Sequence, residues 1–284
     1  MTSLLSAPST ARVPAIAGTA QPVRLHGVER SFPVARGRRD VLRGVDVDVA
    51  AGEIVAIVGP SGCGKSTLLR LVGGLDAPTS GSILLDETGV ADVDERTAIA
   101  FQEPRLLPWR TIAQNVELGL PRGIARREGR ARVRELLDLV GLEQAADQRP
   151  REVSGGMAQR ASLARALARN PGVLLLDEPF GALDALTRLR MHDLLLKIHA
   201  AEPTTILLVT HDVEEALYLA DRVLLLRTLS GDAETDAPSV ARTLSVPGIR
   251  PRDRADQGLA NLRADLLEGL GVDTHHRTAP EENR

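Results

Sequence analysis

The sequence predicts an α/β fold with a mostly parallel sheet, because three continuous apolar runs are separated by helix-like segments. The runs cover residues 54–58, 173–176 and 205–210. Each is uninterrupted rather than alternating, which is typical of strands buried on both faces of a parallel sheet. Helical stretches at 157–169 and 185–201 fit the connections between such strands. Ligands of these sheets bind beyond the carboxyl ends of the strands, so we expect one site there.

A glycine-rich loop follows the first run and fits G-x-x-x-x-G-K-[ST], the pattern of the phosphate-binding P-loop. Its glycines let backbone N–H groups turn inward, and the N-terminus of the helix that follows favours an anion. We expect a nucleoside triphosphate here, with Lys65 on its β- and γ-phosphates and the Ser66 hydroxyl on Mg²⁺. The predicted binding residues are Gly59, Pro60, Ser61, Gly62, Cys63, Gly64, Lys65, Ser66 and Thr67.

Polar residues with catalytic potential follow the other two apolar runs. Asp177 is expected to hold Mg²⁺, and Glu178 beside it to orient or deprotonate the attacking water. The alternative is a pair of acids that caps a helix. His211 is expected to sense the γ-phosphate, although a histidine satisfied in the core or at a helix cap is the alternative. Asp212 after it is a predicted helix N-cap.

A second pair of glycines, Gly155 and Gly156, opens the helical stretch that starts near residue 157. Ser154 is a natural N-cap, and the glycines leave the first N–H groups of the helix exposed. The pattern predicts a second anion-binding helix end, with an ordinary capped helix start as the alternative.

Composition limits the other possibilities. The chain has 284 residues, a formal charge of −3 and one cysteine, Cys63. The mild acidity argues against a nucleic-acid partner, and a single thiol excludes an internal disulfide and suits a reducing cytosol. No apolar run approaches the roughly 18 residues of a membrane span. Cys63 is expected to be a reactive thiol of lowered pKa at the helix N-terminus, with a buried, inert residue as the alternative.

Several motifs together resemble the ATP-binding cassette ATPases. VSGGM at 153–157 resembles their signature motif, with Val153 and Met157 departing from the usual LSGGQ. Gln102 resembles the Q-loop, residues 182–184 resemble the D-loop, and His211 resembles the H-loop. The resemblance covers residues 22–227. It implies ATP as the nucleotide, Gln102 as a catalytic and Mg²⁺-binding residue, and nucleotide contacts from the residues Phe32, Ser154, Gly155, Gly156 and Asp184.

The same resemblance implies a second ATPase subunit, with two ATPs sandwiched in a head-to-tail dimer. It further implies transmembrane permease subunits, a peripheral position on the cytoplasmic face of the cell membrane, and an indirect link to a solute-binding protein. Residues 101–120 and 155–226 are similar to importer ATPases for nitrate, taurine and aliphatic sulfonates, and most similar to those for aliphatic sulfonates. Nitrate, taurine or bicarbonate import, or a cassette ATPase without a permease, remain alternatives.

The expected domains are a disordered tail at 1–21, an ATPase domain at 22–246, and a C-terminal helix and disordered tail at 247–284. Within the ATPase domain we expect an antiparallel layer from 22–53 and 80–101, and a helical subdomain with the signature at about 103–170. A strand at 241–246 and a helix near 259–270 should follow. The resemblance implies a groove beside the Q-loop that receives a permease helix, and Trp109 is expected to anchor that contact, with core packing as the alternative.

Overall fold

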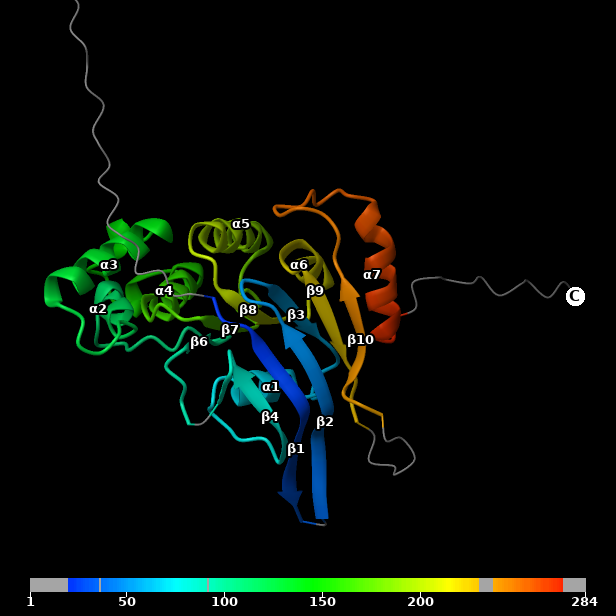
Figure 1. Cartoon of the computed structure of the whole chain (residues 1–284). Helices are drawn as coiled ribbons and strands as arrows, with labels where there is room; N and C mark the ends of the chain where they lie inside the picture. Colours follow the sequence, from blue (N-terminus) through cyan, green and yellow to red (C-terminus); the bar gives the residue numbers. More distant parts are fainter. Residues whose placement is uncertain (1–19, 36, 91, 230–236, 273–284) are drawn as a thin grey trace, which may run out of the picture.

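The structure is a computed structural model that describes residues 20–35, 37–90, 92–229 and 237–272. A six-stranded and a four-stranded sheet form its framework. Figure 1 shows helices above the large sheet and a helical lobe beside it, and helix α1 lies between the two sheets. The predicted fold class, with a mostly parallel sheet, an antiparallel layer and a helical lobe, is confirmed.

The large sheet has the order β10-β9-β3-β8-β7-β6. All its neighbouring pairs are parallel except β9 and β10. Its strands are β3 (Ile54–Val58), β6 (Thr97–Ala100), β7 (Val173–Asp177), β8 (Thr205–Val209), β9 (Arg222–Leu226) and β10 (Val240–Ser245).

The central strands are buried on both faces, as their continuous apolar sequences predict. Val55 and Ile57 join a core with α1 (Lys65–Val72) and the small sheet. Ile54 and Ala56 join a second core with the helices on the opposite face. The sheet is thus fixed from both sides, so the residues after its strands start from well-defined positions.

The small sheet is antiparallel, with the order β2-β1-β4-β5. Its strands are β1 (Val23–Val34), β2 (Gly37–Val49), β4 (Ser80–Leu85) and β5 (Thr88–Gly89). The expectation that all of 80–101 joins this layer is wrong, because β6 pairs in parallel with β7. Three of the four residues of β6 are buried, as in the other strands of the large sheet.

The helical lobe contains α2 (Ile112–Glu117), α3 (Arg126–Leu139) and α4 (Gly155–Ala168). Two short 3-10 helices, Glu143–Ala145 and Pro150–Glu152, connect α3 to α4. Helix α4 contacts both α2 and α3, and also strand β6. Helix α4 therefore packs directly on the large sheet, and the signature segment at 153–157 lies at the start of this helix.

Three further helices pack on the face of the large sheet opposite α1. They are α5 (Ala185–Ala201), α6 (Val213–Leu219) and α7 (Gly258–Gly269). Strand β10 and helix α7 occupy the predicted C-terminal positions within one residue. Most of the predicted tails, residues 1–19 and 273–284, lies outside the described ranges. Gln21, placed in the N-terminal tail by the sequence, donates its N–H to the Gly172 carbonyl. Among the described residues no helix is long and apolar enough to cross a membrane.

Candidate nucleotide site

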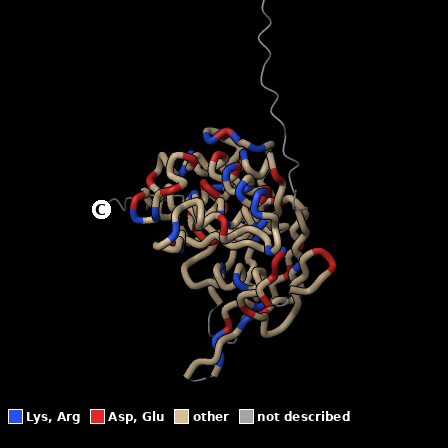
Figure 2. Tube along the Cα trace, turned by 90° about the vertical axis from the view of Figure 1, so that its left-hand side faces the viewer, with Lys and Arg blue, Asp and Glu red and all other residues tan. Residues whose placement is uncertain are grey.

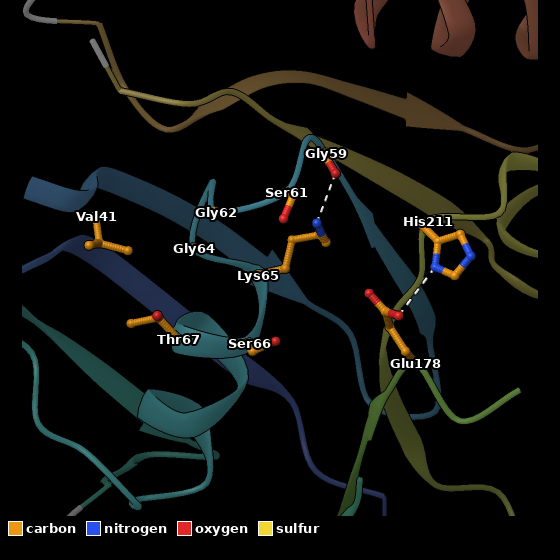
Figure 3. Close-up of a pocket in the computed structure, with 10 residues that line it drawn as sticks. All are labelled: Val41, Gly59, Ser61, Gly62, Gly64, Lys65, Ser66, Thr67, Glu178 and His211. Atoms are coloured by element: carbon orange, nitrogen blue, oxygen red, sulfur yellow. Dashed lines mark hydrogen bonds and ion pairs between the residues drawn. The ribbon is translucent and has the colours of Figure 1, made fainter. Parts of the chain in front are cut away.

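The loop after β3 lines a cavity of about 420 Å³ together with the ends of β7 and β8. Figure 3 shows the glycine-rich loop curving around this space, with Glu178 and His211 on its opposite side. This confirms the prediction that the loops after these strands come together at the carboxyl end of the sheet. The lining residues are Val41, Gly59, Ser61, Gly62, Gly64, Lys65, Ser66, Thr67, Glu178 and His211.

Gly64 makes the tight turn from the loop into α1. Its φ of 101° lies in the left-handed region, and a Cβ there would be 2.7 Å from Cδ2 of Leu42. Both facts require glycine. No side chain caps α1, so its first N–H groups remain available to an anion.

Lys65 is buried at the base of the loop, with 8% of the residue exposed. Its ammonium group donates hydrogen bonds to the carbonyl oxygens of Gly59, at 2.8 Å, and Pro60, at 3.0 Å. A buried ammonium needs such acceptors. Phosphate oxygens would offer it charged acceptors, which form stronger hydrogen bonds than neutral carbonyls.

Ser66 and Asp177 form a pair of oxygen-bearing side chains that could ligate a metal ion near Lys65. The Ser66 hydroxyl donates to Oδ1 of Asp177 at 3.0 Å. Burial raises the pKa of Asp177 above its usual value, and the charge of Glu178 raises it further, while Ser66 and nearby cations oppose the shift. A divalent cation would relieve this cost, and a hydroxyl and a carboxylate are ligands that Mg²⁺ accepts. The described residues contain no cluster of three His, Cys, Asp or Glu side chains suited to a metal.

The carboxylate of Glu178 is contacted by two polar side chains from other segments of the chain. Nδ1 of His211 lies 3.2 Å from its Oε2, and the Gln102 amide donates to the same oxygen at 3.3 Å. The backbone N–H of Glu178 donates to the Val209 carbonyl at the end of β8. Its φ of 47° is unusual for a residue other than glycine and costs conformational energy. The surrounding contacts therefore hold this carboxylate in a defined position facing the P-loop cavity.

The predicted signature residues lie elsewhere, around a second cavity of about 610 Å³. Ser154 caps α4 by accepting a hydrogen bond from the N–H of Met157 at 3.3 Å, as predicted. Asp184 caps α5 by accepting from the N–H of Thr187 at 3.0 Å, and hydrogen bonds from the Thr187 side chain and then its backbone hold the pKa of Asp184 below the usual value. The two cavities share no lining residue. Most of the predicted nucleotide-contacting residues thus fall into two separate groups within one chain.

Phe32 does not line either cavity. The Arg30 guanidinium covers its ring instead, 4.4 Å from the centroid. Val41, on β2, reaches the P-loop cavity and was not predicted. An ordinary apolar residue in a strand carries no signal of this kind, and its position follows from a strand pairing with several register shifts.

Cys63 is buried, with 1% of the residue exposed. Burial raises the pKa of its thiol, although Lys65 and backbone hydrogen bonds act in the opposite direction. The expectation of a lowered pKa is wrong, because loss of solvation outweighs the favourable charge of the loop. The alternative of a small buried residue describes Cys63 better.

We therefore expect Cys63 to react slowly with a maleimide in the folded protein. A buried thiol of raised pKa has little thiolate at neutral pH, and the reagent cannot reach it. The time course of adduct formation, followed by mass spectrometry, should be slow for native protein and fast after denaturation. Rapid labelling of native protein that MgATP prevents would contradict this expectation and restore the reactive-thiol hypothesis.

The chain is similar in sequence to proteins of a known family. The family model described as ABC transporter matches residues 42–181. An aliphatic sulfonates import ATP-binding protein of Mesorhizobium japonicum is 49% identical, over 86% of both chains. One of Streptomyces avermitilis is 47% identical, over 94% of this chain and 93% of its own length. One of Rhodococcus jostii is 50% identical, over 81% of this chain and 87% of its own length.

Solved cassette structures share the fold. The ATP-binding cassette MJ0796, in a dimeric post-hydrolysis state bound to ADP and Pi, superposes with a TM-score of 0.69 at 34% identity. It covers 80% of this chain, and all of that chain is matched. Another dimeric structure of MJ0796, described as a bacterial ABC transporter cassette, gives the same TM-score at 33% identity. The chain belongs to the ABC transporter family and is one of its ATP-binding, ATP-hydrolysing cassettes.

Proposed function

We propose that this chain is the ATPase subunit of an importer and energises the uptake of aliphatic sulfonates. The observation that carries the proposal is the identity of 47–50% to proteins named for that activity, over more than four-fifths of each chain. The transported solute would not contact this subunit, so the proposal of the solute rests on these relatives. The proposal that ATP hydrolysis drives uptake rests on the P-loop cavity as well.

The division of the predicted contacts into two cavities supports a head-to-tail dimer. The P-loop of one copy would face the Ser154 segment of the second, so that each ATP lies between two chains. Two features favour this arrangement: the exposed start of α4 offers its N–H groups to an anion, and the similar cassette structures are dimers.

The side chains of the P-loop cavity suit hydrolysis of a γ-phosphate. Lys65 would bind the β- and γ-phosphate oxygens, and Ser66 and Asp177 would hold Mg²⁺, with Gln102 as a further candidate ligand. Bound there, Mg²⁺ neutralises phosphate charge. Glu178 would accept a proton from the water that attacks the γ-phosphorus, while the bond to the ADP oxygen breaks. His211 and Gln102 keep the Glu178 carboxylate oriented, since both contact its Oε2.

The proposed partners are permease subunits at the cytoplasmic face of the membrane. A nucleic-acid partner is not favoured, because the sequence has a formal charge of −3 and Figure 2 shows acidic and basic residues interspersed along the described chain. The test is uptake by vesicles that contain the chain with its matched permease and binding protein. ATP-dependent uptake of alkanesulfonates is the expected result. Uptake of nitrate, taurine or bicarbonate instead, or of none of these solutes, would contradict the proposed solute.

We propose Trp109 as a contact of the permease. It lies between β6 and α2 with 69% of the residue exposed, so the core-packing alternative is wrong. We expect Trp109→Ala to keep basal ATP hydrolysis but to weaken permease binding by about 30-fold, because aromatic anchors of interfaces contribute about 2 kcal/mol or more. Binding can be titrated with the intrinsic fluorescence of the wild type, whose only tryptophan it is, using a tryptophan-free permease.

The matched control is Val93→Ala, which removes another exposed apolar side chain. Normal assembly and transport by the Trp109→Ala variant would contradict the coupling role. Equal losses in both variants would also count against it, since the effect would then not be specific to this loop.

A further inference from the structure

One loop of the chain lies between the two cavities. Residues 178–184 begin at Glu178, in the P-loop cavity, and end at Asp184, in the signature cavity. Halfway along, a Cβ placed on Gly181 would lie 3.6 Å from Cε1 of His211 and 3.7 Å from Nε2 of Gln102. The position of this loop therefore bears on the groups that orient the Glu178 carboxylate.

Arg188 joins this loop to the segment that carries His211. It lies in the first turn of α5, where its Nη2 donates to the Leu183 carbonyl at 3.2 Å. Its Nη1 donates to Oδ2 of Asp212 at 3.1 Å. The side chain is 28% exposed and that of Asp212 is 26% exposed, so the ion pair is partly shielded from water. One guanidinium thus spans a backbone group of the first loop and the residue next to His211.

The two carboxylate oxygens of Asp212 have different partners. Oδ1 accepts from the backbone N–H groups of Glu214 and Glu215 and so caps α6. Oδ2 is bound by Arg188. The backbone N–H of Asp212 donates to the Thr210 hydroxyl, which fixes the turn around His211 from its other side. Arg188 therefore contacts the carboxylate of Asp212, the residue that immediately follows His211.

We propose that Arg188 is a positioning residue for ATP hydrolysis, which couples the loop at the signature cavity to His211 and thereby to Glu178. Arg188 lines neither cavity, and its hydrogen bonds go to the Leu183 carbonyl and the Asp212 carboxylate, so it acts through other residues. A displacement of about 1 Å in a catalytic group can cost about 100-fold in rate. The inference rests on the proposed roles of Glu178 and His211.

Loss of Arg188 should leave the two helices packed. Nε2 of His192 lies 3.1 Å from Oε2 of Glu215, with both side chains 3% exposed. The Tyr218 hydroxyl donates to Asp193 at 2.6 Å. These contacts join α5 to α6 independently of Arg188, so its removal is expected to alter the loops rather than the fold.

The test compares Arg188→Met, Asp212→Asn and the double variant with the full-length wild type. Asparagine keeps an oxygen that can cap α6 but removes the charge that Arg188 binds. We expect each single variant to lower kcat about tenfold, with the Kd for ATP unchanged within about twofold. The double variant should be no slower than either single one, because both remove the same link. Arg188→Lys should recover only part of the rate, since an ammonium cannot span both acceptors as the planar guanidinium does.

Lys197→Met is the matched control, since it removes an exposed cation from the same helix. A wild-type kcat in Arg188→Met, or independent losses that multiply in the double variant, would overturn the inference. If Arg188→Met does not fold, wild-type kcat in Asp212→Asn would overturn it equally. Absence of ATP hydrolysis by the wild type would instead refute the proposed function, so the two failures can be distinguished.

Discussion

Replacing Glu178 with glutamine is expected to lower kcat for ATP hydrolysis by about 100-fold or more, because general-base catalysis contributes about that much. Glutamine has nearly the same shape, so it can keep contacts with His211 and Gln102, whose partner is Oε2 of Glu178. It cannot accept a proton from water. ATP binding should therefore be retained while the chemical step fails.

The measurement is steady-state phosphate release together with the Kd for ATP. Glu128→Gln, which neutralises an exposed carboxylate on α3, is the matched control and should hydrolyse ATP normally. A loss below about tenfold in Glu178→Gln would show that another group accepts the proton. A large loss of ATP affinity would show that the carboxylate acts in binding instead.

Replacing Lys65 with alanine is expected to weaken ATP binding itself, by about 10- to 150-fold. The ammonium lies buried at the base of the glycine-rich loop, where it bonds two carbonyl oxygens. Bound phosphate would provide charged acceptors, and hydrogen bonds to charged groups contribute roughly 1.5–3 kcal/mol. Calorimetric titration with ATP measures the change directly.

The only other lysine of the sequence provides the control. Lys197→Ala removes an exposed ammonium on α5 and should leave the Kd for ATP unchanged. If Lys65→Ala binds ATP with wild-type affinity and remains folded by circular dichroism, the P-loop cavity is not the main phosphate site.

The strand ends that build the site could be predicted from the sequence because their signals are local and strong. The uninterrupted apolar runs before Gly59, Asp177 and His211 predict buried parallel strands, and parallel strands bring their ends to one edge. Figure 3 shows the outcome, with Glu178 and His211 facing the P-loop. The helix caps Ser154 and Asp212 were predicted for the same reason, since a cap depends on the few residues that follow it.

The remaining features depend on contacts between distant segments. Strand β6 is only four residues long, too short for its sheet to be predicted. The position of Val41 depends on register shifts between β1 and β2. The pKa of Cys63 depends on burial, which overrides the charge effect expected from the loop. The contact of Arg188 with the Leu183 carbonyl depends on the path of a loop, for which no side-chain pattern exists.

In the proposed dimer, ATP lies between the P-loop cavity of one chain and the signature cavity of a second. Gly155 allows a sharp test, because a Cβ added there meets nothing within 4 Å beyond its chain neighbours and the backbone of its own helix. Aspartate at this position should preserve the monomer, since an acid is favourable in the first turn of α4. Across a dimer interface, however, its charge would repel the phosphates.

The direct measurement is the molar mass in solution of Glu178→Gln, by light scattering, with and without MgATP. The mass should double when ATP is added. The Glu178→Gln, Gly155→Asp double variant should bind ATP through its P-loop yet keep the mass of a monomer. A mass that stays monomeric in Glu178→Gln saturated with ATP, or that doubles equally in the double variant, would contradict the shared site.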